Sequence, residues 1–331
     1  MSNGNRLVVI ALLVLATVLV LADFKAIQSH RAADETALSP NTLSSSGQQL
    51  SSPGKTESDF YSNASENALP SSGTSGSVTA APSVSPVSDI VTASAYVVGD
   101  VQTGKIYMEK NDTAVLPVAS MSKLVTAIAA TDTMTPTTTI EVTEPETEVY
   151  PDQSNLQPGE KFTVQELLYP LLLDSSNVAA EALASSTDRA HFLNLMNGYA
   201  WELGMTGAYF GDPSGLSPHN MASASDFFKL AEYLYLDRPD ILAITRTVST
   251  SVGTTTEHGA HVFASIQPFV KDPRFIGGKT GHTDEAADTM LTILNIGGKP
   301  IAIIVLHSIS GDRTHDTELL ASKVSTMLTS L

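Results

Sequence analysis

The amino-acid composition changes abruptly along this chain of 331 residues, and the changes decide which part of it can form a hydrophobic core. Residues 7–22, LVVIALLVLATVLVLA, are an unbroken apolar run, whereas residues 26–93 are dominated by Ser, Thr, Gly, Pro, Asn and Gln. A segment of the second kind cannot bury enough apolar area to offset the entropy lost on ordering. We therefore expect one folded domain, at residues 94–331, which is long enough for a single core.

The N-terminal apolar run indicates export from the cytoplasm. Arg6 precedes the run, and Asp23 and Lys25 follow it. The run is longer than the hydrophobic part of a typical cleavable signal peptide and slightly shorter than the roughly 20 residues of a full membrane span. We expect residues 1–25 to be an uncleaved membrane anchor, with a secretion signal cleaved after Ala22 as the alternative. Residues 26–93 would then be a disordered tether that reaches roughly 45 Å on average.

The charge and the residue types exclude several classes of function. The chain has 18 Lys+Arg against 35 Asp+Glu, a formal net charge of −17, and an acidic surface repels nucleic acid. It has no cysteine, which excludes a thiolate nucleophile and disulfides. His258 and His261, in EHGAH, have metal-like spacing without a third ligand, so we expect a loop there. We expect no metal and no cofactor, and we expect the acidic segment 141–152 to be a solvated rim.

Strand patterns occur at the two ends of the domain and helical patterns lie between them. SAYVVGD, the turn DVQTGK and IYMEK predict a β-hairpin that begins near Ala95. TMLTILNI and PIAIIVLHS, joined by GGK, predict two more strands. The simplest architecture is an α+β fold, in which both ends of the domain build an antiparallel sheet, helices pack on its faces, and a helical insert lies between them.

Apolar periodicity and capping residues predict five helices. They are a buried helix over 119–130; one capped by Thr163 and Glu166, which Pro170 should kink or break; HFLNLMNGYAWELG, with Phe192, Leu195, Met196, Tyr199, Ala200 and Leu203 in the core and Gly204 as C-cap; one capped by Ser223 and Asp226; and a last helix that buries Leu319, Leu320, Val324, Met327 and Leu328.

A serine and a lysine at the start of the first of these helices form a candidate catalytic pair. Ser120 and Lys123, in PVASMSKL, are three residues apart, so their side chains share one helix face. Serine is a poor nucleophile unless a base takes its proton, and keeping an ordinary lysine neutral at pH 7 costs about 4.6 kcal/mol. Burial and a second cation both lower that cost. Lys279, in GGKTGHTDEA, is the candidate for the second cation.

The three short motifs S-x-x-K, S-x-N and K-T-G are informative only together. S-x-x-K also occurs at Ser52 and Lys55, inside the expected tether, where it can have no catalytic meaning. S-x-N occurs at Ser175 and Asn177, between two predicted helical segments, and again within residues 26–93. K-T-G occurs once, at 279–281. The specific observation is that all three follow one another in this order within the predicted domain.

With these motifs the chain resembles the serine D-alanyl-D-alanine carboxypeptidases, which are low-molecular-mass penicillin-binding proteins of the bacterial cell wall. The resemblance runs from about residue 94 to 331. It includes AYVVGDVQTGKIYMEKN, LQPGEKFTVQELLYPLLLDSSNVAAEALA, LNLMNGYAWELGM, PSGL at 213–216, and KTGHTDEA. It implies a penicillin-binding/β-lactamase-like fold, peptidoglycan stem peptides as substrates, β-lactams as covalent inhibitors, and action outside the cytoplasm.

The resemblance also implies roles for the residues of the first two motifs. Ser120 would attack the carbonyl between the two D-alanines and hold the peptide as an acyl-enzyme, with Lys123 as general base. Ser175 would relay a proton towards the departing D-alanine. The amide of Asn177 would hold the substrate backbone.

The third motif would bind the substrate. Lys279 would set the electrostatics around both serines, Thr280 would bind the terminal carboxylate, and Gly281 would leave room for the substrate strand at the sheet edge. The backbone N–H groups of Ser120 and His282 would form the oxyanion hole. We expect the His282 side chain to have no general-base role.

The chain departs from the family pattern in two places. Its second motif is DSSNV, where the family more often has glycine or alanine before the asparagine and an acidic residue after it. Many relatives also continue into a second β-domain with an amphipathic anchor, whereas this sequence stops at the predicted last helix, which favours anchoring at the N-terminus.

Three alternative activities remain at this point: an endopeptidase of the same family, a serine β-lactamase, and a wall-binding protein without turnover. In one lactamase class a glutamate followed four residues later by asparagine activates the water. Four glutamates lie between the second and third motifs: Glu181, Glu202, Glu232 and Glu257. The residues four positions after them are Ser, Thr, Leu and His, so none has the asparagine. The lactamase hypothesis is therefore weaker, and an intact Ser120 with Lys123 argues against a protein without turnover.

Overall fold

The computed structural model describes residues 90–330 apart from 149–151, 153 and 310. The predicted anchor at 1–25 and all but the last residues of the predicted tether lie outside the described residues. Thr92 and Ala93, at the end of that expected tether, donate their backbone N–H groups to the Asp316 carboxylate at 2.7 and 2.9 Å. Across the described ranges, no helix is long and apolar enough to cross a bilayer.

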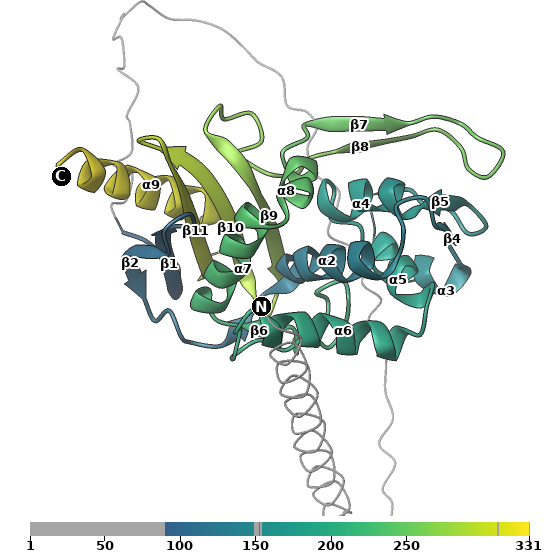
Figure 1. Ribbon diagram of the computed structural model, residues 1–331, viewed down its shortest axis with the longest axis horizontal. Helices are drawn as coiled ribbons and strands as arrows, with labels where there is room; N and C mark the ends of the chain where they lie inside the picture. The colour runs from purple at the N-terminus through teal and green to yellow at the C-terminus, as the bar shows by residue number, and fades with distance from the viewer. Residues whose placement is uncertain (1–89, 149–151, 153, 310, 331) are drawn as a thin grey trace, which may run out of the picture. The chain divides into compact units, whose positions relative to one another are not determined.

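A five-stranded antiparallel sheet joins the two ends of the domain, as the sequence predicts (Figure 1). The strand order is β2-β1-β11-β10-β9. The strands are β1 Ala95–Asp100, β2 Lys105–Lys110, β9 Phe275–Thr283, β10 Ala287–Ile296 and β11 Lys299–Ser308. Because β9 is last in this order, the K-T-G motif lies on an edge strand of the sheet.

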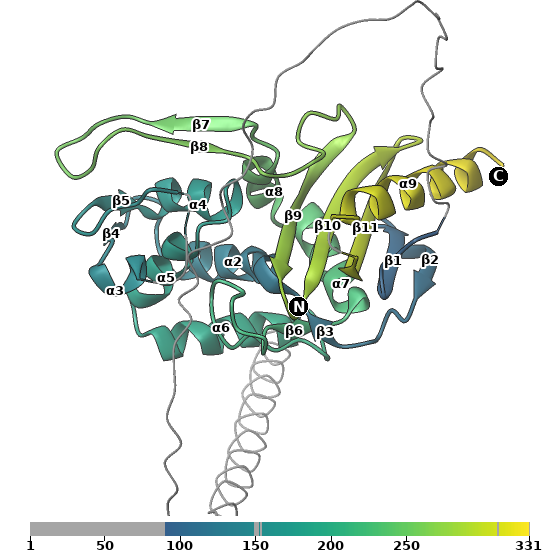
Figure 2. The same cartoon turned by 180° about the vertical axis from the view of Figure 1, so that it is seen from behind.

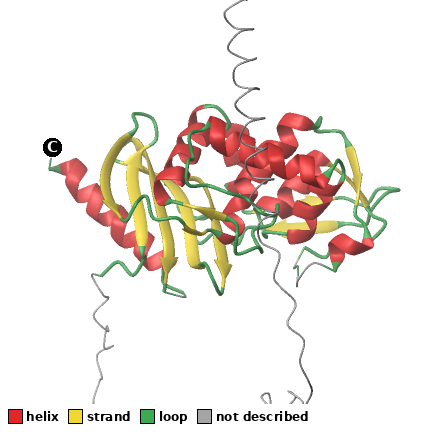
Figure 3. Cartoon of the chain, turned by 90° about the horizontal axis from the view of Figure 1, so that it is seen from below, coloured by secondary structure: helices red, strands yellow, loops and turns green. Residues whose placement is uncertain are grey.

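Helices cover both faces of this sheet, which explains why β10 and β11 read as nearly continuous apolar runs. Helix α9, Arg313–Thr329, packs on one face, and α7, Ala224–Leu236, packs on the other (Figure 2). Seen from below, the strands stand between α9 and the remaining helices (Figure 3). Side chains alternate between the two faces, so neighbouring Val97 and Val98 belong to different apolar clusters.

The helical insert is built around α2, Lys123–Thr133, in which residues 123–130 are all buried. This agrees with the predicted helix that is apolar on nearly every side. The first residues of that prediction, Ala119–Ser122, instead form a 3-10 turn, η1, which carries Ser120. The other helices are α3 Glu144–Thr147, α4 Val164–Leu172, α5 Asn177–Ser185, α6 Arg189–Glu202 and α8 Pro239–Thr245.

The capping predictions are confirmed at both helices where the sequence has the signature. Thr163 and Glu166 form a reciprocal capping box at α4, and Ser223 and Asp226 form one at α7. Pro170 lies inside α4, which ends two residues later, at Leu172. In α9 the prediction is wrong for Met327, whose side chain is 43% exposed and lies outside the core.

Short strand pairs complete the fold and had no clear sequence signal. They are β3 Leu116–Pro117 with β6 Met221–Ala222, β4 Thr139–Glu141 with β5 Lys161–Thr163, and β7 Ser249–Val252 with β8 His261–Ala264. His258 lies in the turn between β7 and β8 as expected, and its ring stacks on Phe162 at 4.5 Å. His261 begins β8, where Nε2 lies 2.9 Å from Glu160 Oε1. These histidines fasten the β7–β8 hairpin to the helical insert.

The acidic segment 141–152 is only partly the solvated rim that its composition indicates. Glu146 is buried and completes a capping box with Thr143 at α3. Asp152 also turns inward, towards the start of α5. The expectation is therefore wrong for these two carboxylates, because both accept backbone N–H groups that the surrounding fold would otherwise leave unpaired.

Candidate active site

Ser120 and Lys123 are in direct contact, as their spacing predicts. Ser120 lies on η1, and Lys123 is the first residue of α2. Lys123 Nζ is 2.9 Å from Ser120 Oγ and 2.7 Å from Asn177 Oδ1, and it also donates to the backbone oxygen of Ser214. Three groups that are far apart in sequence therefore converge on one amine.

The environment of Lys123 favours the neutral amine. Its side chain is 0% exposed, and this burial lowers its pKa from 10.5 to about 7, although the carboxylates of Asp212, Asp152 and Glu181 act in the opposite direction. Relative to an ordinary lysine, that change favours the neutral form by about 5 kcal/mol. At neutral pH a large fraction of Lys123 can therefore act as a base.

The partners of Lys123 also direct its lone pair. Asn177 Oδ1 and the Ser214 carbonyl oxygen are acceptors only, so each takes one N–H of the amine. A neutral amine has two N–H groups, and the remaining position faces Ser120 Oγ, the one partner of the three that has a proton to give. This arrangement can remove the Ser120 proton, which is what an attacking serine needs.

Lys279 lies close to this pair, with its amine on the second serine. Its Nζ donates to Ser175 Oγ at 2.8 Å and to the Thr280 backbone oxygen at 3.0 Å, and its side chain is 0% exposed. Burial, then the charges of Lys123 and Arg313, hold the pKa of Lys279 well below its usual range, while Asp174 opposes them. The charge of Lys123 therefore acts on Lys279, whereas the predicted action of Lys279 is not among the influences that set the pKa of Lys123.

Close backbone packing fixes the position of Ser120. Ala119, immediately before it, has φ +49°, a strained conformation for a residue with a side chain. Gly215 has φ +90°, and a Cβ there would lie 2.2 Å from Ala119 O. A Cβ on Gly281 would lie 2.7 Å from Val118 O. Gly281 therefore lets β9 pack against η1, the turn that carries Ser120, which is a reason different from the predicted one of leaving room for substrate.

The second motif occupies the loop between α4 and α5, as predicted. Ser175 has φ +65°, and Asn177 is the first residue of α5. Asp152 supports this loop and was missed from the sequence: its Oδ2 accepts from Ser176 Oγ at 2.6 Å and from Val178 N at 2.7 Å. Burial acts to raise the pKa of Asp152, but these hydrogen bonds outweigh it and the pKa is lowered. An anion at a helix N-terminus is favourable.

Asp174 adds a titratable carboxyl directly before Ser175. Burial raises its pKa to about 7, with the charge of Asp152 adding to the effect and that of Lys279 opposing it. Its Oδ1 is buried and has no hydrogen-bond partner among the described residues. The acidic position of this second motif thus lies on the N-terminal side of the serine.

Gly281 and the residues after it form a polar cluster with Arg313 of α9. The sequence did not predict the part played by Arg313. Arg313 donates to Gly281 O at 2.8 Å, and His282 Nδ1 lies 2.8 Å from Asp288 Oδ1. His282 is thus paired through its side chain with the adjacent strand, while the side chain of Thr280 is almost fully buried. Arg313 adds a positive charge near Lys279 at the edge of the sheet.

The structure thus brings the predicted site residues together on three neighbouring segments. η1 and α2 supply Ser120 and Lys123, the α4–α5 loop supplies Ser175 and Asn177, and β9 supplies residues 279–282. β9 packs directly against η1. Arg313, Asp152 and the turn at 212–217 complete the surroundings.

Comparisons with known proteins agree with this site and fold. The family described as D-alanyl-D-alanine carboxypeptidase matches residues 80–310. A D-alanyl-D-alanine endopeptidase of Haemophilus influenzae is 32% identical over 207 residues, which are 61% of this chain and 70% of the relative. A D-alanyl-D-alanine carboxypeptidase of Mycobacterium tuberculosis is 26% identical over 219 residues, which are 66% of this chain and 75% of the relative.

A solved structure extends the comparison to three dimensions. Penicillin-binding protein D2 of Listeria monocytogenes, in a cefotaxime-bound form, superposes with a TM-score of 0.62 at 27% identity, over 72% of this chain and 98% of that one. The likeness confirms the predicted penicillin-binding fold, with its antiparallel sheet and helical insert. By its sequence match over residues 80–310, this chain belongs to the D-alanyl-D-alanine carboxypeptidase family of serine peptidases.

Proposed function

We propose that the chain removes the terminal D-alanine of peptidoglycan stem peptides through an acyl-enzyme on Ser120. The observation that carries this proposal is the contact of Ser120 Oγ with Lys123 Nζ at 2.9 Å, in a site where the lysine is completely buried and its other two partners are acceptors. A buried neutral amine can take the proton of the serine hydroxyl beside it, so the serine can act as nucleophile and the amine as its base.

In this mechanism Lys123 takes the Ser120 proton as Oγ bonds to the carbonyl carbon between the two D-alanines. The tetrahedral oxyanion is held by the N–H groups of Ser120 and His282. The C–N bond then breaks, Lys123 gives up its proton, which reaches the departing D-alanine amine through Ser175, and the peptide stays bound to Ser120 as an ester. Water hydrolyses that ester, again with Lys123 as base, and Ser120 regains its proton.

The positive charges at the sheet edge suit a substrate that ends in a carboxylate. Arg313 lies close enough to Lys279 to lower its pKa, and it donates to the backbone oxygen of Gly281, the residue after Thr280. A free carboxylate gains more from such a region than an amide does. This favours a carboxypeptidase, which requires a free C-terminus, and Asn177 would hold the backbone of the same substrate.

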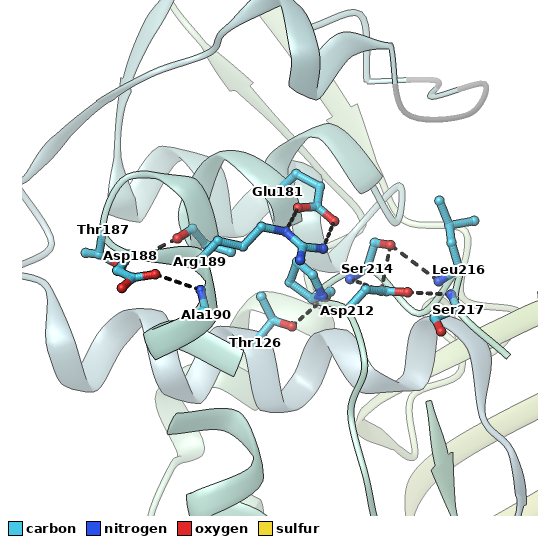
Figure 4. A network of polar contacts seen from close by, with 12 residues as sticks. Thr126, Glu181, Thr187, Asp188, Arg189, Ala190, Asp212, Ser214, Leu216 and Ser217 are labelled. Carbon is cyan, nitrogen blue, oxygen red and sulfur yellow. Dashed lines mark hydrogen bonds and ion pairs between the residues drawn. The ribbon is translucent and has the colours of Figure 1, made fainter. Parts of the chain in front are cut away.

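The β-lactamase alternative gains no support from the glutamates of the site. Glu181 is the glutamate whose charge acts on Lys123, and Arg189 binds it through two nitrogens, at 2.7 and 3.1 Å (Figure 4). A carboxylate held in this way is a poor base for an incoming water molecule. The endopeptidase alternative has more support, since several relatives, that of Haemophilus influenzae among them, have this name.

Two substrates distinguish the activities. We expect the purified protein to release D-alanine from a wall pentapeptide, and Ser120→Ala to abolish this release without changing the circular dichroism spectrum. Cleavage of a cross-linked peptide dimer at a rate above that of the pentapeptide would replace the carboxypeptidase by the endopeptidase. Rapid loss of a bound fluorescent penicillin would instead identify a β-lactamase.

A cell-wall peptidase acts outside the cytoplasm, and the N-terminal segments fit that location. The apolar run at 7–22 would anchor the protein in the bacterial membrane, with residues 26–93 as the tether that lets the domain reach the wall. Fractionation of cells that express the full chain tests this directly. We expect the full chain in the membrane fraction, and recovery of an N-terminally processed form in the medium would favour a cleaved signal instead.

A further inference from the structure

A tight turn at residues 212–217 is organised by one buried carboxylate. Asp212 is 8% exposed, and its Oδ1 accepts from Ser214 N at 2.7 Å, from Ser214 Oγ at 2.9 Å and from Gly215 N at 2.6 Å. Its Oδ2 accepts from Ser217 N (Figure 4). Four donors thus converge on one side chain, which is how a carboxylate stabilises an irregular backbone that no strand or helix holds.

This turn touches both members of the catalytic pair. The Ser214 carbonyl accepts a hydrogen bond from Lys123 Nζ. The next residue, Gly215, packs so closely that a Cβ would lie 2.2 Å from Ala119 O and 2.7 Å from Ser120 N. The position of the turn therefore sets both the direction of the amine and the backbone from which Ser120 projects.

A second contact ties the turn to the helix that carries the base. Thr126 Oγ1, one helical turn beyond Lys123 on α2, donates to Pro213 O at 2.6 Å. Asn220 holds the other side, because its Nδ2 donates to Asp212 O at 3.0 Å. The turn is thus attached to α2 through both Lys123 and Thr126, so that displacing it would move the acceptor away from the amine.

We propose that Asp212 is a positioning residue for the reaction: by fixing the turn 212–217, it places the Ser214 carbonyl that orients the Lys123 amine towards Ser120. Asp212 acts through the turn and through space, without touching the substrate. The proposal rests on the proposed function, since it assumes that Lys123 is the base.

The charges around Lys123 give this proposal a signature that a purely structural residue lacks. Burial lowers the pKa of Lys123, and Asp212 is the largest of the opposing influences, ahead of Asp152 and Glu181. Arg189 pairs with Glu181 and is itself influenced by the charge of Asp212, and Lys279 is the second lysine near the pair. Removing the Asp212 charge should therefore lower the pKa of Lys123 further.

The test is Asp212→Asn, measured as the second-order rate constant for acylation by a fluorescent penicillin from pH 5 to pH 9. The amide keeps the size of the side chain but cannot accept all four donors. We therefore expect the plateau of the rate constant at high pH to fall by about tenfold, the usual effect of losing hydrogen bonds to a charged group. At the same time the acidic limb of the pH profile, where the rate constant falls as Lys123 becomes protonated, should move to lower pH. Asp226→Asn is the matched control, because Asp226 is a buried capping carboxylate that does not act on Lys123. We expect it to leave the acidic limb where it is in the wild type.

Two results would overturn the proposal: a folded Asp212→Asn protein with the wild-type plateau, or a lowered plateau with an unmoved acidic limb. If Asp212→Asn does not fold, Thr126→Val decides, because it removes one of the two attachments of the turn to α2 without removing a charge. We expect a lower plateau with an unchanged limb, and a wild-type plateau would contradict the positioning role. Failure of the proposed function itself appears separately, as absence of acylation in the wild type.

Discussion

The reaction of Ser120 with a β-lactam should depend on pH through Lys123. The neutral amine is the active form, and burial lowers the pKa of Lys123 to about 7. Half of the protein therefore carries the neutral base at pH 7, and about one hundredth carries it two pH units lower. The rate constant of acylation should thus fall about 50-fold from pH 7 to pH 5, and it should approach a plateau above pH 8.

Stopped-flow or gel-based measurement with a fluorescent penicillin gives this rate constant directly, because the carboxylate of the drug stays ionised across the range. Lys123→Arg is the control. Because arginine cannot be deprotonated in a protein, this substitution should abolish acylation at every pH. An acylation rate that is flat from pH 5 to pH 8, or a reactive Lys123→Arg variant, would show that Lys123 is not the base. An acidic limb near pH 10 would show that burial of Lys123 does not perturb it.

Two further substitutions test the supporting structure. Gly215→Ala places a Cβ 2.2 Å from Ala119 O, so both the melting temperature and the acylation rate should fall. Gly298→Ala is the control, because Gly298 has a similar φ of +80° but a Cβ there would have no atom within 4 Å. It should lower only the stability, by about 1–2 kcal/mol. Asp152→Asn weakens the hold on Ser176 and should cost about 1–3 kcal/mol in denaturant unfolding, with slower labelling. Because folding lowers the pKa of Asp152, its contribution is present at neutral pH and disappears as the pH falls through the folded-state pKa, so a pH-independent difference from wild type would contradict this.

Much of the fold could be predicted because local signals agreed with the tertiary structure. The capping pair Thr163 and Glu166 marks the start of α4 by a contact between residues three apart. The alternating pattern from Ala95 and the two apolar runs near the C-terminus predict strands, and their places at opposite ends of the domain imply a shared sheet. The prediction that Met327 is buried was wrong, because helical periodicity predicts which residues share a helix face but not how far the sheet extends beneath that face.

The contact between the two proposed catalytic residues could be predicted, whereas the carboxylates that support them could not. Ser120 and Lys123 share a helix face, so their contact follows from spacing. Asp152 contacts Val178 across 26 residues, and Asp212 acts on the Lys123 amine through the Ser214 carbonyl and through its charge. In sequence, both look like ordinary solvated acids, because only tertiary packing decides which carboxylates meet unpaired backbone N–H groups.

Mapping a β-lactam adduct checks the claim that Lys123 makes the hydroxyl of Ser120 reactive. Peptide mass spectrometry of the penicillin-treated protein should place the drug on Ser120, with no adduct in Ser120→Ala and almost none in a folded Lys123→Ala protein at pH 7. An adduct on another residue, or a Lys123→Ala variant that acylates at the wild-type rate, would contradict the claim.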